Sequence, residues 1–140
     1  MSGGDILKTL ILSAVMMLGM AAQAYPTADF DFAVTSPRPG LVTFGDFIAA
    51  PGFPNVRGAW VQAVRWYYST DGFAAITPDS PYIEQWLDPR DGSLPPLGIG
   101  NLPSGVRYYF KVGLATRDGG LVYFTNDYET DMARHSVVVL

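Results

Sequence analysis

The chain has 140 residues, of which 49% are hydrophobic and 16% are charged, and its net charge is −4. This length accommodates one domain, and the hydrophobic content excludes a disordered chain. The negative net charge argues against a nucleic-acid ligand, because phosphate binding needs a basic surface. Cysteine is absent, so disulfides, thiolate metal sites and cysteine nucleophiles are all excluded.

The first 24 residues have the pattern of a cleaved signal peptide. Lys8 precedes an uncharged apolar run over residues 10–22, which has the length of a signal-peptide core and is too short to span a bilayer. Ala22 and Ala24 form a small-x-small cleavage site. We therefore expect residues 1–24 to be removed and the protein to be periplasmic or secreted, without membrane insertion after cleavage. An uncleaved anchor and a buried helix are the alternatives.

Residues 25–140 are expected to form a single domain built from short strands. The 11 prolines and 15 glycines of the chain leave little room for long helices. Seven or eight strands at the observed spacing indicate an all-β, antiparallel sandwich. The predicted strands cover residues 30–34, 41–48, 60–69, 82–87, 97–102, 106–116, 121–126 and 136–139.

Residues 102–112 resemble the pattern of fibronectin type III domains. Leu102 and the Pro-Ser-Gly turn after it precede Tyr108 and a strand in which apolar residues alternate. The resemblance implies an immunoglobulin-like sandwich with Tyr108 as its tyrosine corner, a residue whose hydroxyl bonds to upstream backbone. It implies nothing about the ligand, since sandwiches host many unrelated functions.

Residues suited to catalysis are sparse. His135 is the only histidine and no Gly-x-Ser-x-Gly motif is present, so neither a Ser-His-Asp triad nor a histidine-based zinc site is supported. We interpret His135 as a surface or strand-edge residue. Asp79, Glu84, Asp88 and Asp91 are interpreted as solvated turn acids rather than as a glycosidase pair. We therefore expect no enzyme, with a small hydrolase as the least favoured alternative.

Three alternating acids follow the predicted strand at residues 121–126. On an extended segment Asp127, Glu129 and Asp131 would point to one side and offer oxygen ligands to calcium. The loop spacing and glycine of an EF-hand are missing. A solvated acidic loop is the favoured interpretation and a calcium site is the alternative. No other cofactor is expected.

The aromatic residues predict a binding surface. Side chains switch face at every residue of a strand, so Trp66 and Tyr108 facing the core place their neighbours outward. Exposed Tyr and Arg are enriched at protein interfaces, whereas a covered face with stabilising cross-strand pairs is the alternative. The residues of this expected binding face are Arg65, Tyr67, Tyr109 and Lys111.

We expect an exported, non-catalytic interaction or structural module. Its protein partner would bind through the aromatic sheet face or through an edge strand, with residues 25–34 and 136–140 as candidate edges. A carbohydrate-binding module is the alternative. A coplanar row of exposed Trp and Tyr rings would favour a sugar, and an exposed edge strand or a flat aromatic patch would favour a protein.

Overall fold

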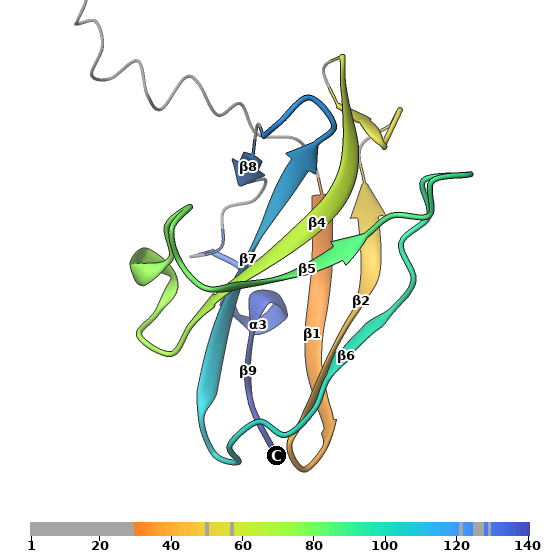
Figure 1. Ribbon diagram of the computed structural model, residues 1–140. Coiled ribbons are helices and arrows are strands. Elements are labelled where there is room, and N and C mark those ends of the chain that lie inside the picture. Colours follow the sequence, from red (N-terminus) through yellow and green to blue (C-terminus); the bar gives the residue numbers. More distant parts are fainter. Residues whose placement is uncertain (1–29, 50, 57, 121, 125–127, 129) are drawn as a thin grey trace, which may run out of the picture.

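The computed structural model describes residues 30–140, apart from residues 50, 57, 121, 125–127 and 129. The described strands form two antiparallel sheets (Figure 1). The first sheet has the order β1-β2-β6, from β1 (Phe30–Arg38), β2 (Leu41–Ala49) and β6 (Leu97–Ile99). The prediction of a mostly β, antiparallel fold is confirmed.

The second sheet is built around its two longest strands, β4 (Ala59–Ser69) and β7 (Arg107–Thr116). It follows the order β3-β4-β7-β8, while β5 pairs with β4 and β9 pairs with β7. The remaining strands are β3 (Asn55–Val56), β5 (Tyr82–Trp86), β8 (Val122–Phe124) and β9 (Ser136–Val138).

Each of the eight predicted strands overlaps one observed strand. Three short elements were not predicted, namely β3, the 3-10 helix η1 (Phe73–Ala75) and the helix α3 (Met132–His135). Among the described residues, no helix is both long and apolar enough to cross a membrane.

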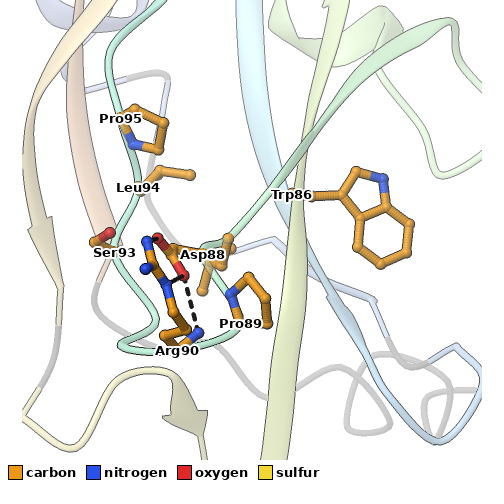
Figure 2. A pocket seen from close by; sticks show the side chains of 8 residues that line it. Trp86, Asp88, Pro89, Arg90, Ser93, Leu94 and Pro95 are labelled. Atoms are coloured by element: carbon orange, nitrogen blue, oxygen red, sulfur yellow. Dashed lines mark hydrogen bonds and ion pairs between the residues drawn. The ribbon is translucent and has the colours of Figure 1, made fainter.

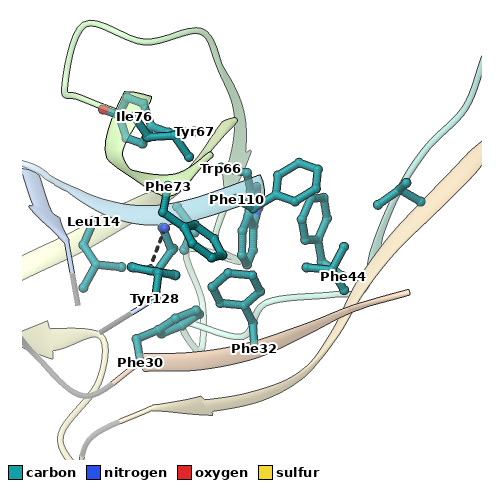
Figure 3. Close-up of a cluster of buried hydrophobic side chains, with 14 of the residues drawn as sticks. Phe30, Phe32, Phe44, Trp66, Tyr67, Phe73, Ile76, Phe110, Leu114 and Tyr128 are labelled. Atoms are coloured by element: carbon teal, nitrogen blue, oxygen red, sulfur yellow. Dashed lines mark hydrogen bonds between the residues drawn. The ribbon is translucent and has the colours of Figure 1, made fainter. Parts of the chain in front are cut away.

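The core lies between the two sheets and consists mainly of aromatic rings (Figure 3). Phe44 of β2 stacks on Trp66 of β4 with ring centroids 4.4 Å apart. Phe32 of β1 meets the same indole edge-on at 4.9 Å, and Phe110 of β7 meets Phe44 edge-on at 4.9 Å. Such pairs contribute about 0.5–1.5 kcal/mol beyond the burial of their apolar area, so rings can hold the sheets together without disulfides.

Tyr108 lies on the core-facing side of β7, as the alternation predicts. Its ring centroid lies 6.2 Å from that of Tyr68 and 6.3 Å from that of Phe110. Its hydroxyl makes no hydrogen bond with any residue that the structure describes. The hydrogen bond expected of a tyrosine corner is therefore absent from this part of the chain.

The C-terminal strand β9 is paired within the fold. Tyr108 of β7 lies opposite Val137 of β9, and the other side of β9 contacts β1. Beyond β9, the Leu140 N–H donates to Ser36 Oγ at 2.9 Å and the Gly40 N–H donates to the Leu140 carbonyl at 3.0 Å. Within the described residues β9 pairs with β7 alone, so the expectation that residues 136–140 include an edge strand agrees with the pairing, although this edge lies against β1. Its use by a partner stays a prediction.

The first strand is likewise used inside the fold. Phe30, Phe32 and Val34 of β1 point into the core, with exposed fractions of 1%, 0% and 5%, and β1 pairs with β2 along its length. Within the expected edge at residues 25–34, the part from Phe30 onward directs alternate side chains into the core, and β1 is an end strand of its sheet among the described residues. Residues 25–29 lie outside the described residues.

Candidate binding site

Strand β5 forms an outer edge of the second sheet. In the part of the chain that the structure describes, β5 pairs with β4 and with no other strand. Its register places Ile83 opposite Trp66 and Glu84 opposite Arg65. A strand paired on one side only offers its other side to an incoming strand.

The hydrogen-bond pattern identifies which backbone groups are free. The Tyr68 N–H donates to the Pro81 carbonyl at 3.1 Å, and the Leu87 N–H donates to the Gln62 carbonyl at 3.0 Å. Bonded and non-bonded pairs alternate along an antiparallel ladder. The N–H and carbonyl groups of the intervening even-numbered residues therefore point away from β4. These residues are Tyr82, Glu84 and Trp86.

The same three residues present their side chains to solvent. Tyr82 is 44% exposed and Trp86 is 59% exposed. Between them, Glu84 accepts a hydrogen bond from Arg65 Nε at 3.0 Å, and the Arg65 guanidinium lies 4.7 Å from the centre of the Tyr82 ring. Two large aromatic rings on one exposed strand form a surface of the composition found at protein interfaces.

A groove of about 550 Å³ adjoins the Trp86 end of β5. Figure 2 shows Trp86 on one side of this groove, with Ser93, Leu94 and Pro95 on the other. A compact turn forms its floor, in which Asp88 Oδ2 accepts a hydrogen bond from Arg90 Nη2 at 3.0 Å. The paired Arg90 lowers the pKa of the Asp88 carboxyl, so this acid stays charged and already has a cation as its partner.

The turn is held in place by close packing at Gly92. This residue has a φ of +71°, and a Cβ atom added to it would lie 2.7 Å from Pro54 Cγ. Glycine is the residue that tolerates both the positive φ and such a close approach. The turn therefore gives this groove a fixed floor.

A second groove, of about 380 Å³, lies on the other side of Trp86 and is also lined by Trp60. Trp60 is 38% exposed, and the Arg117 guanidinium lies 4.9 Å from the centre of its ring. Among the described residues, Trp60, Tyr82 and Trp86 are the large aromatic residues that are exposed. All three lie on β4 and β5.

The expected binding face at Arg65, Tyr67, Tyr109 and Lys111 is largely covered. The expectation that Tyr67 is exposed is wrong, since its exposed fraction is 0%. Its ring packs against Tyr82 at 5.2 Å and against Phe124 of β8 at 5.3 Å. The register of β4 was predicted correctly, but the outer face of the sheet carries a second layer of side chains.

Tyr109 and Lys111 are half-buried on the same outer face. Phe73 of η1 meets the Tyr109 ring edge-on at 5.1 Å. Lys111 Nζ lies 5.8 Å from the centre of the Phe124 ring. Arg65 borders the exposed surface of β5, and a binding role for it, as for Tyr109 and Lys111, stays a prediction.

Of the acids proposed as calcium ligands, Asp127 and Glu129 lie outside the described residues. Asp131 is described, and it lies close to Asp31 and His135, with ligand atoms within 4.8 Å of one another. The Arg134 guanidinium sits among these groups, with its Nε 3.2 Å from Asp31 Oδ2 and 3.6 Å from Asp131 Oδ2. A cation of the protein itself therefore already contacts both carboxylates.

His135 is not a surface residue, which corrects the prediction. It is 1% exposed, and its Nε2 lies 2.8 Å from Asp31 Oδ1. Burial raises the pKa of the Asp31 carboxyl. The hydrogen bonds from His135 and from the Phe32 N–H, together with the charge of Arg134, outweigh this effect and hold the pKa below its ordinary value. This cluster joins β1 to α3 and lies apart from the grooves beside Trp86.

Comparison with known proteins found neither a matching family model nor a similar curated protein.

Proposed function

We propose that the chain is an exported, non-catalytic binding module with an immunoglobulin-like fold, which holds a protein partner by strand addition at β5. Three features support the fold and the export. The order β1-β2-β6 in one sheet and β5-β4-β7 in the other requires chain crossings between the sheets, as in Greek-key sandwiches. Residues 102–112 carry the fibronectin type III pattern, and residues 1–24 carry the pattern of a signal peptide.

The observation that carries the proposal is the free edge of β5. Backbone groups that point outward supply affinity in strand addition, and the side chains beside them supply specificity. Tyr82 and Trp86 expose rings on this strand, where a partner would cover them. The charged residues nearby, Arg65 and Arg90, are each already paired with an acid, so the partner is held mainly by backbone bonds and apolar contacts.

Site-specific photocrosslinking tests the proposal. A benzoylphenylalanine in place of Trp86 is expected to crosslink to a protein in the native host, whereas the same probe at Thr35, exposed on the first sheet, is not. Adding Glu84→Pro should abolish the adduct, because it removes an outward N–H. Adding Glu84→Gln should retain it. An adduct that survives Glu84→Pro would show that the partner does not pair with this edge.

A carbohydrate is the second candidate ligand, and the groove between Trp60 and Trp86 is the observation that favours it. Exposed indole faces stack on the apolar faces of sugar rings. A glycan array probed with the purified domain tests this candidate. A glycan hit that is lost in Trp60→Ala and kept in Glu84→Pro would establish sugar binding, and the absence of any hit would exclude it for the glycans displayed.

Export has its own test. Expressed in its host, the protein is expected to begin at Tyr25 and to appear in the extracytoplasmic fraction. Intact-mass measurement checks the cleavage site. A soluble protein that retains Met1 would contradict the export prediction without bearing on the binding site.

A further inference from the structure

An apolar cleft of about 180 Å³ lies near the middle of β5, between the two sheets. Tyr68 and Ile83 line it from the second sheet and Ile99 lines it from β6 of the first. No charged residue is among its lining residues. The other three are Leu102, Tyr108 and Phe110.

The cleft is at the open side of the two packed sheets. Within the described residues, β5 pairs with β4 alone and β6 pairs with β2 alone, so each of these strands ends its sheet. Neither edge is covered by another described strand. The cleft is therefore a place where core side chains adjoin an unpaired backbone edge.

The register of β5 determines which side chains of an added strand would reach this cleft. Ile83 and Gln85 face the core side of the sheet, since they lie opposite Trp66 and Val64. In an antiparallel pair, residues directly opposite each other point to the same face. A residue opposite Ile83 therefore points into the cleft, and a residue opposite Glu84 points to the outer face.

The neighbouring inward position is closed. Gln85 is 8% exposed, and its side chain is bonded at both ends. Its Oε1 accepts from Trp66 Nε1 at 3.2 Å, and its Nε2 donates to the Pro95 carbonyl. Only the position at Ile83 thus has open apolar volume, and it has room for one bulky side chain.

We propose that the partner of β5 is an extended, antiparallel peptide segment that inserts one large aliphatic side chain, such as Leu, Ile or Met, into this cleft. The inference rests on the proposed strand addition and specifies its ligand. An antiparallel orientation fits because antiparallel pairing is the more stable and is the arrangement of every pair in the described sheets. An uncharged segment fits because no unpaired charge lines the cleft.

Two capped, fluorescently labelled peptides test the inference. One has the sequence Lys-Thr-Leu-Thr-Leu-Thr-Lys, and in the other serine replaces both leucines. Burying a leucine side chain removes enough apolar surface from water to change affinity at least about tenfold. We therefore expect the leucine peptide to bind the domain at least about tenfold more tightly in fluorescence anisotropy. Raising the salt concentration should not remove the difference between the two peptides, since both carry the same two lysines.

Three variants assign the effect to the cleft. Ile83→Phe fills the cleft and should remove the preference for the leucine peptide. Glu84→Pro should abolish binding of both peptides, and Glu84→Gln should leave both unchanged. Asp79→Asn, in an exposed loop outside the cleft, is the surface control and should keep the preference. Circular dichroism and thermal unfolding of each variant establish that it is folded.

The outcomes separate this inference from the proposed function. Equal binding of the two peptides, lost in Glu84→Pro, would uphold strand addition and overturn the aliphatic insertion. A leucine preference that persists in Ile83→Phe would also overturn it, because the side chain would then enter elsewhere. If neither peptide binds, the insertion is wrong, and strand addition is decided by the crosslink at position 86.

Discussion

Two tyrosines, Tyr108 and Tyr128, differ in what their hydroxyl groups contact. The Tyr128 hydroxyl accepts the Val112 N–H at 2.8 Å, on the side of β7 that β8 and β9 leave unpaired between them. Tyr128 is 3% exposed, so water cannot replace this bond. A side chain from the chain after β8 thus completes the ladder of β7.

Substitution of each tyrosine by phenylalanine should separate the two roles. Tyr128→Phe leaves a buried N–H without an acceptor and is expected to lower the free energy of unfolding by about 1–3 kcal/mol. Tyr108→Phe is expected to change it by less than about 0.5 kcal/mol. Urea unfolding measures both values. A large loss in Tyr108→Phe would indicate that its hydroxyl has a partner after all, as a tyrosine corner requires.

The Asp31 carboxyl makes stability depend on pH. Its pKa is lower in the folded protein than in the unfolded chain, so folding favours the charged form. The resulting stabilisation is present above the unfolded pKa and is lost as the pH falls through the folded pKa. Urea midpoints should therefore fall between about pH 5 and pH 2, and Asp31→Asn should flatten this dependence. Asp79→Asn, in an exposed loop, is the control and should keep the slope.

At the scale of single residues, the alternation of β4 and β7 predicted which side chains face the core but not what covers the other face. Trp66 and Tyr67 are adjacent and both are 0% exposed, because rings from β5 and β8 pack on Tyr67 at the outer side. Those contacts join residues far apart in the chain, and no local period records them. The burial of His135 depends in the same way on Asp31, which lies 104 residues earlier.

Among the elements, β5 is the one whose backbone decides the proposed function. Proline at Glu84 removes an N–H that points away from β4, and edge strands tolerate such a change. Proline at Ile83 removes an N–H that bonds to Trp66 and should cost about 3 kcal/mol or more. We expect Glu84→Pro to fold and Ile83→Pro to be strongly destabilised relative to Ile83→Ala. Thermal unfolding measures the difference between the variants. If Glu84→Pro is instead the more strongly destabilised one, the even-numbered residues of β5 bond to β4, and its register differs by one residue.

The long elements could be predicted and the short ones could not. Strands β4 and β7 have apolar residues at alternate positions bounded by Gly and Asp turns, which is a strong local signal. By contrast, β3 and α3 have 2 and 4 residues, too few to show a period. The exposed pair Tyr82 and Trp86 lies in a predicted strand, yet its exposure depends on β5 having a single neighbour, and sequence alone does not give the order of strands in a sheet.

At the scale of the whole molecule, we expect the last five residues to be required for a stably folded domain. Val139 is 1% exposed and its burial contributes about 1.5–3 kcal/mol, to which the β9 ladder adds. A domain of this size has a net stability of about 5–15 kcal/mol. Deletion of residues 136–140 is therefore expected to abolish the cooperative unfolding transition. Val138→Ser, at a 41% exposed position, is the control and should leave the transition in place.

The contact between β1 and β9 also bears on how the domain transmits force. His135 lies beside Asp31 near the start of β1, and Leu140 lies beside Ser36 and Gly40 near its end, so the first and last strands run in the same direction (Figure 1). Tension applied at the two chain ends would slide these strands past each other and load their contacts together, instead of peeling them apart one at a time.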